Sequence, residues 1–363
     1  MLFKSNSKST YRRALNIGAS ALWHLPGRFG IARMLGSSYW LRCVVFHDVA
    51  PRESDFTRGM GVSITPTQFE IAIEFLAKYY NPVSLQDVLD HQYGRSLPAR
   101  AVLVTFDDGY ASLMESAIPA CKRLGIPAVL FLNSAYLGNH QLSADNLVCY
   151  VANTVGLEAL NAAARSVRGD AAPKLESFME VFRVLFPSLS LSQREAFLQS
   201  LVSIAGINER ELAGRVGLYL TVDHVRDLVS CGFEIGNHTR SHVHCRCLTR
   251  PDIGDEIDRN KTDLEDLSAK PVRSFSVPYG SSADLSANVQ QHLRRTGHEV
   301  IFLSQAVANP CRKDRLCIDR VGTLARNDDS LFLDLELMPR LRRIREWMGF
   351  HNKASQSNFG EAF

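Results

Sequence analysis

Residues 101–110 read AVLVTFDDGY, and this stretch determines how the rest of the chain is interpreted. Ala101 to Phe106 is a short apolar run, which predicts a buried strand. Asp107 and Asp108 follow at once, and Gly109 permits a sharp exit of the backbone. In parallel α/β folds, catalytic groups gather at the C-terminal ends of strands. Two adjacent acids there repel each other unless a cation or a proton intervenes, so the stretch predicts either a functional site or a simple Asp-Asp-Gly turn.

Other short apolar runs predict further buried strands, at residues 41–46, 127–132, 232–236, 272–277 and 299–303. Helical patterns separate these runs. Near-continuous apolar strands that alternate with helices indicate a parallel sheet covered on both faces. Closed on itself, such a sheet is a distorted TIM-like (β/α) barrel, and we expect this α/β fold.

Residues 141–219 interrupt the alternation and show no strand signal. Ser192 and Glu195 predict a capping box that opens a helix ending at Gly206. We interpret the segment as a helical insertion in a barrel that spans 41–330, serving as a lid or a dimer surface.

The ends of the chain are assigned to segments outside the barrel. Residues 331–363 are expected to form a C-terminal helix and tail. In the N-terminal helical segment, 1–40, basic residues precede a modest apolar stretch. A plain helix, a basic helix on a membrane surface and an atypical export signal all fit this pattern. We therefore expect a cytoplasmic location or one peripheral to the inner membrane, with export left open.

The composition narrows the classes of protein. Of the 363 residues, 45% are apolar and 22% charged, which is typical of a globular protein. A net charge of +3 is too small to predict a nucleic-acid partner. The eight cysteines are scattered, so we interpret them as mostly buried thiols in a reducing compartment. No run approaches the roughly 20 apolar residues that a membrane span needs.

Histidines follow two of the predicted strands. His238 and His242 come after the strand at 232–236, and histidines four residues apart can hold one metal ion. His244 lies at the wrong offset for that face, and we expect it to be exposed to solvent. His47 ends the first strand and lies at the same expected rim.

A rigid turn follows another strand. Pro278 and Gly280 fix the backbone around Tyr279, and such a turn can aim a backbone N–H at a developing oxyanion. Together, the strand ends offer a base, metal ligands, an oxyanion donor and an acid, which are the parts needed for metal-assisted amide hydrolysis. Two histidines and one carboxylate leave metal positions open for water and a carbonyl oxygen.

Three of these motifs resemble those of the polysaccharide deacetylase, or NodB-homology, family. TFDDGY at 105–110 is similar to its first motif, HTRSH at 238–242 to its second and SVPYG at 276–280 to its third. The resemblance covers roughly 41–324, interrupted by the insertion. It implies a NodB-type barrel and a metal-dependent hydrolase that removes N-acetyl groups from amino sugars, with zinc as the default metal.

The resemblance also implies roles for individual residues. Asp107 matches the catalytic base. Asp108, His238 and His242 match the metal ligands. Tyr279 matches the residue whose backbone N–H meets the oxyanion.

The general acid of this family is usually a late histidine, and residues 316–323 offer none. VVFHDV at 44–49 is similar to the first strand of circularly permuted members, the poly-N-acetylglucosamine deacetylases among them. In that arrangement His47 is the acid, and a histidine with a pKa near 6.5 can donate a proton at neutral pH.

The third motif departs from the family. Ser276 stands where the family often has an arginine that orients the base. Another cation must then serve, and Arg240, Arg273 and Arg320 are the candidates among which the sequence does not choose.

The expected function is therefore carbohydrate N-deacetylation, acting on an N-acetylated polysaccharide or a lipid-linked amino sugar. One alternative is a deformylase or deacetylase of a lipid-linked sugar at the membrane, reached through the N-terminal segment. Two histidines and a carboxylate also describe a non-haem iron oxygenase. A non-catalytic glycan-binding barrel is the remaining alternative.

Overall fold

The structure, a computed structural model, describes residues 40–310, 317–323, 325 and 327–347. Nearly all of the N-terminal segment assigned to 1–40, and the tail after 347, lie outside the described residues. Among the described helices, none combines the length and the apolar character that crossing a membrane requires.

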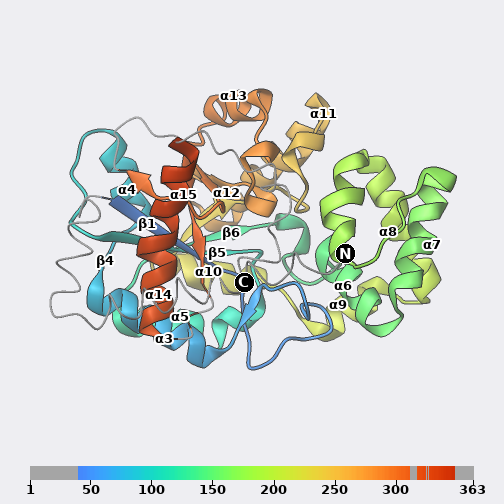
Figure 1. Cartoon of the computed structure of the whole chain (residues 1–363), viewed down its shortest axis with the longest axis horizontal. Helices are drawn as coiled ribbons and strands as arrows, with labels where there is room; N and C mark the ends of the chain where they lie inside the picture. The colour runs from blue at the N-terminus through green and yellow to red at the C-terminus, as the bar shows by residue number, and fades with distance from the viewer. Residues whose placement is uncertain (1–39, 311–316, 324, 326, 348–363) are drawn as a thin grey trace.

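A barrel of parallel strands forms the body of the molecule (Figure 1). Neighbouring strands follow the order β12, β1, β5, β6, β7, β8, β9, β11. Their bounds are β1 Trp40–Phe46, β5 Ala101–Asp107, β6 Ala128–Leu132, β7 Glu234–Asn237, β8 Ser274–Ser276, β9 Val300–Leu303, β11 Cys317–Asp319 and β12 Val321–Gly322. The six predicted strands are confirmed within two residues or so at each end, and the predicted TIM-like α/β fold is confirmed.

Arg320 marks the point where the barrel returns on itself. Only this residue separates β11, which pairs with β9, from β12, which pairs with β1. The last strand on one side of the parallel sheet, β11, and the last strand on the other side, β12, are therefore joined by a single residue of the chain.

Among the described residues, six strands were not predicted from the sequence: β11 and β12 in the barrel, and four strands of two residues each that extend the sheet or pair beside it. Two of them, β4 Asn81–Pro82 and β10 Asn309–Pro310, pair with β5 and β1 respectively. The other two, β2 Asp48–Val49 and β3 Ser63–Ile64, pair with each other.

Side chains alternate along β5, as the pleat of a strand requires. Val102, Val104 and Phe106 pack in the core cluster that includes the outer helices. Thr105 and Asp107 point the other way and both contact Arg320 inside the barrel. Asp107 is therefore the last inward residue of the strand, at the rim of the barrel.

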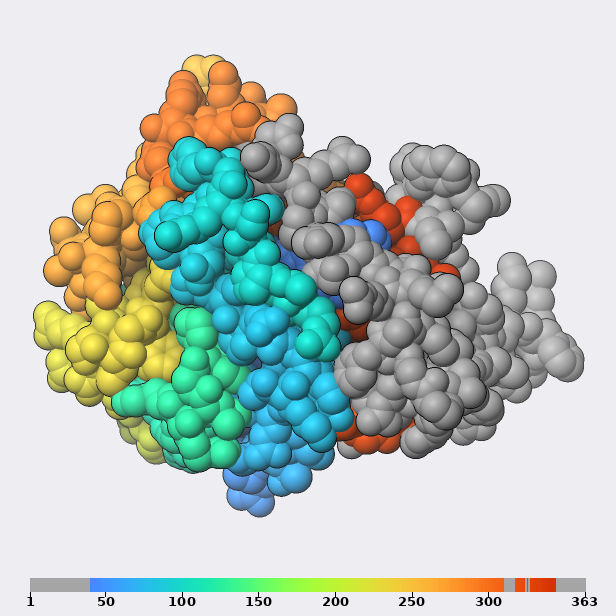
Figure 2. All heavy atoms as spheres, turned by 90° about the vertical axis from the view of Figure 1, so that its left-hand side faces the viewer, coloured from blue at the N-terminus to red at the C-terminus, as the bar shows by residue number. Residues whose placement is uncertain are grey.

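Helices cover the outside of the barrel. Thr65 and Gln68 form a capping box at the start of α3. On the face away from the insertion, the segments of α3 to α5 (blue to green) lie beside those of α10 to α13 (yellow to orange; Figure 2). The bounds are α3 Pro66–Tyr79, α4 Leu85–Gln92, η1 Ala111–Met114, α5 Ala117–Leu124, α10 Val222–Ser230, α11 Arg250–Ile253, η7 Gly254–Asp258, α12 Arg259–Ser268, α13 Ala287–Arg295, α14 Asp328–Phe332, η10 Leu333–Leu337 and α15 Met338–Trp347.

Between β6 and β7 the chain forms a group of helices beside the barrel, on the right in Figure 1. They bury an apolar cluster of their own. The predicted capping box at Ser192 is wrong: α8 starts two residues earlier, with Ser190 as cap and Gln193 as its partner. The helices are α6 Ala144–Thr154, α7 Leu157–Arg168, η3 Gly169–Ala171, η4 Val181–Leu185, η5 Phe186–Ser188, α8 Leu191–Ala205 and α9 Glu209–Val216.

The described cysteines carry free thiols, with mixed exposure. Those at 43, 121, 149 and 245 are buried, as expected, whereas Cys247 and Cys317 are half-buried. Cys231 is exposed, as a set of mostly buried thiols allows.

The strand that leads to the histidine motif has no room for an added methyl group. In β7, a Cβ on Gly236 would lie 2.4 Å from the ring of Phe131 and 2.7 Å from the Ser274 hydroxyl. We expect Gly236→Ala to lower the free energy of unfolding by about 1–3 kcal/mol, because both neighbours are buried. Urea denaturation measures the change. Gly254→Ala, where an added Cβ meets nothing within 4 Å, is the control, and an equal effect in the two variants would contradict the steric argument.

Candidate active site and metal centre

Asp108 begins the turn that leaves β5. Its backbone is left-handed, with φ 67°, and Gly109 follows with φ 70°. For an aspartate this conformation is uncommon and costs energy, and such strain gathers at functional sites. The turn carries the Asp108 side chain away from the inward direction of Asp107 and towards the histidine loop.

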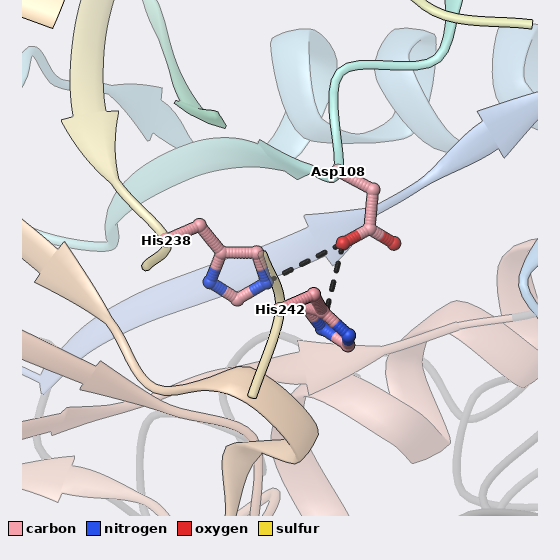
Figure 3. Close-up of side chains that lie close together, drawn as sticks. All are labelled: Asp108, His238 and His242. Carbon is pink, nitrogen blue, oxygen red and sulfur yellow. Dashed lines mark ion pairs between the residues drawn. The ribbon is translucent and has the colours of Figure 1, made fainter. Parts of the chain in front are cut away.

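Asp108, His238 and His242 come together at the rim of the barrel (Figure 3). Their potential ligand atoms all lie within 4.8 Å of one another. Oδ1 of Asp108 is 3.5 Å from Nε2 of His238 and 3.6 Å from Nε2 of His242. The two histidines reach one point because the loop between them is sharply bent, with φ 61° at Thr239 and φ 50° at His242.

The chemistry of these three residues fits a divalent cation. Asp108 Oδ1 is buried yet accepts no hydrogen bond from the part of the chain that the structure describes. Each imidazole is held through Nδ1: His238 by the carbonyl oxygen of Ser276, and His242 by Oδ2 of Asp145, both at 2.8 Å. Both Nε2 atoms are therefore free to face Asp108, as in metal sites where a second group fixes the tautomer.

The electrostatic environment also favours a cation. Burial on its own would lower the pKa of His242, but Asp145 and Asp108 outweigh it and raise that pKa to about 9. The two carboxylates thus favour positive charge at this point of the rim.

Asp107 is fixed by a buried arginine. Nη1 and Nη2 of Arg320 donate to the two carboxylate oxygens, each at 2.7 Å, and both side chains are almost inaccessible to solvent. Arg320 is therefore the one of the three candidate arginines that contacts the predicted base, since Arg273 pairs with Glu299 instead.

Ser276 completes this arrangement. Its hydroxyl lies 2.7 Å from Nη2 of Arg320 and 3.3 Å from Oδ2 of Asp107. The serine thus occupies the expected third-motif position, while the guanidinium comes from the residue between β11 and β12. Although burial would raise the pKa of Asp107, Arg320 and His238 outweigh it and hold that pKa below its usual range.

His47 lies at the same rim. It follows β1 directly, and Phe46 pairs in register with Phe106 of β5, so His47 comes level with Asp107. Burial lowers the pKa of His47, and the nearby Asp108 and Asp107 partly oppose that effect. The pKa of His47 is therefore lower than the unperturbed value near 6.5 that was expected from the sequence.

Tyr279 lies in a tight turn after β8, at φ 61°, with its neighbour Gly280 packed against Ser304. Its ring stacks on that of His244, with centroids 3.8 Å apart and an angle of 13°. Its hydroxyl donates to Oδ1 of Asp145 at 3.0 Å.

The expectation that His244 is exposed is wrong. It is buried, with Nδ1 2.9 Å from Oδ1 of Asp284 and Nε2 3.0 Å from the carbonyl oxygen of Phe182. The offset argument assumed a regular backbone, whereas the left-handed residues in this loop redirect the chain. His244 supports the Tyr279 ring and does not face Asp108.

A model of the polysaccharide deacetylase family matches residues 94–301. The chain belongs to this family. It is accordingly a hydrolase of carbon–nitrogen bonds other than peptide bonds, which removes the oxygenase and the non-catalytic barrel from consideration. No curated protein matches the sequence.

Solved structures of deacetylases share the fold. The Streptococcus pyogenes deacetylase PplD, in complex with acetate, has a TM-score of 0.54 at 14% identity, over 82% of this chain and 98% of that one. BC0361, a polysaccharide deacetylase from Bacillus cereus, has a TM-score of 0.51 at 13% identity, and the match covers 82% of this chain and 69% of that one. A de-N-acetylase from Aggregatibacter actinomycetemcomitans has a TM-score of 0.50 at 18% identity, and the match covers 79% of this chain and 95% of that one.

We expect one divalent cation per chain, and we expect His238→Ala to lose it without unfolding, because one of two imidazole ligands is removed. Elemental analysis after dialysis measures the metal, and circular dichroism monitors the fold. His140→Ala, at an exposed position, is the control. Full metal content in the His238 variant would refute this ligand assignment.

Proposed function

We propose that this chain removes N-acetyl groups from the amino sugars of a polysaccharide or glycoconjugate, with zinc as its metal. The observation that carries the proposal is the arrangement of two carboxylates on one strand end. Asp107 is held inward by Arg320, and Asp108 faces two imidazoles. The family description supports an acetylated polysaccharide as the substrate class.

Asp108, His238 and His242 would hold the cation. When bound, a divalent ion of this kind polarises a carbonyl oxygen and brings the pKa of a bound water towards about 7. Nitrogen and carboxylate ligands of this type suit zinc, and three protein ligands leave positions open.

Asp107 acts as the general base in this proposal. Its lowered pKa keeps it ionised at neutral pH and ready to accept a proton from the attacking water. Arg320 donates a hydrogen bond to each carboxylate oxygen of Asp107, and these two bonds fix the orientation of the carboxylate. The lone pairs that they leave unused are the ones that can accept the proton.

His47 acts as the general acid. The nitrogen of an amide leaves poorly as an anion, so it must receive a proton as the C–N bond breaks. A protonated imidazole at this position gives its proton to the leaving nitrogen. Because burial lowers the pKa of His47, this imidazolium gives up its proton readily, and the fraction of chains that carry it rises as the pH falls. In this proposal the backbone N–H of Tyr279, which lies in the tight turn after β8, donates to the oxyanion.

Acetate release from N-acetylglucosamine oligomers tests the function. We expect release to stop with a chelator and to return with zinc. We expect Asp107→Asn to lower kcat by about 10²–10⁴-fold with metal content unchanged, because an amide cannot accept the proton. Asp170→Asn, an exposed position, is the matched control. An Asp107 variant within a few-fold of wild type would place the base elsewhere.

Substrates with different leaving groups test whether His47 is the general acid. We expect His47→Gln to lower amide hydrolysis by about 10²–10⁴-fold, yet to leave hydrolysis of 4-nitrophenyl acetate within several-fold of wild type, since that phenolate departs without a proton. Assays of both substrates, with His140→Gln as control, measure the difference. Equal losses on the two substrates would exclude a role as general acid.

A further inference from the structure

Asp145 belongs to the insertion, not to the barrel. It lies in the first turn of α6, where Ser143 caps the helix and Asn146 donates to that cap. Although charged, Asp145 is only 6% exposed. A carboxylate is rarely buried to this extent unless it is paired, so its partners indicate what the residue does.

Both partners of Asp145 come from the active-site rim. Oδ2 lies 2.8 Å from Nδ1 of His242, and Oδ1 accepts from the hydroxyl of Tyr279 at 3.0 Å. One carboxylate thus joins a proposed metal ligand to the residue whose backbone is proposed to meet the oxyanion. The two rings are themselves in contact, with centroids 4.7 Å apart.

A second group of the insertion holds the same loop by its backbone. Nη2 of Arg194, a buried residue of α8, donates to the carbonyl oxygens of Ser241 and His242 at 3.1 and 3.2 Å. These contacts lie at the residue whose φ is 50°. Such strained backbone persists only where surrounding groups hold it, and here helices of the insertion supply that support.

We propose that Asp145 is a positioning residue that fixes His242 for metal binding and ties it to Tyr279, so that the insertion is part of the metal centre. The inference rests on the proposed assignment of His242 as a ligand. A carboxylate on Nδ1 keeps the proton on that nitrogen, which leaves the Nε2 lone pair for the cation. Its negative charge also strengthens the ligand.

The two proposed histidine ligands differ in this respect. The partner of His238 is a backbone carbonyl of the barrel, at Ser276. The partner of His242 is a side chain from the insertion. Substitution can therefore remove the support of one ligand and leave that of the other intact.

The test is a titration of the metal-free full chain with Co²⁺, followed by its visible absorption, which reports affinity and ligand geometry without turnover. We expect Asp145→Ala to raise the dissociation constant by about 10–100-fold and to alter the spectrum. Asp145→Asn, nearly isosteric, keeps a hydrogen-bonding group without the charge and should fall between wild type and Ala. It also carries the test if the Ala variant does not fold.

Three comparisons make the result decisive. Asp170→Ala, an exposed acid of the insertion, should bind as wild type does. Tyr279→Phe removes only the hydroxyl contact and should stay within about threefold; a loss as large as that of Asp145→Ala would overturn the direct action on His242. If His242→Ala loses Co²⁺ while both Asp145 variants bind it within twofold of wild type, the role of Asp145 is refuted and the assignment of His242 as a ligand stands. Wild-type binding by His242→Ala would instead overturn the ligand assignment itself.

Discussion

Arg320 lies where the barrel closes, and its guanidinium reaches across the interior to Asp107. It also donates to the hydroxyl groups of Thr105, Ser276 and Ser304, so the ends of β5 and β8 and the residue after β9 meet at one cation. A buried charge without its partner is costly, about 3–5 kcal/mol when one member of such a pair is removed. Burying either charge at this rim without the other is therefore strongly unfavourable.

The position of the site follows from that constraint. Because Asp107 is fixed inward, the next residue must leave the strand at the rim, and the left-handed turn at Asp108 directs its carboxylate towards the histidine loop. His47 arrives level with them because β1 pairs in register with β5. Loops from different strands therefore meet at this rim.

Local patterns in the sequence predicted six strands, the barrel and the residues that gather at its rim. These patterns did not predict which residues far apart in the sequence contact each other. Arg320 and its rivals Arg240 and Arg273 are equivalent until the strands are placed in space. Asp145 lies in no motif and far from His242 along the chain, so spacing carried no signal for it. The burial of His244 was missed because left-handed loop residues break the periodicity on which the prediction depended. The family match at 94–301 also stops short of both His47 and Arg320.

The pairing of β12 with β1 has a consequence for how the protein forms. The two strands come from opposite ends of the chain, and contacts so distant in sequence are the slow ones in folding. During synthesis from the N-terminus, Asp107 and all three proposed ligands emerge before Arg320 does. Until that residue docks, the carboxylate must stay hydrated, and the interior cannot exclude water. We therefore expect the ion pair that orients the base to be among the last contacts to form, after every motif of the site has been synthesised.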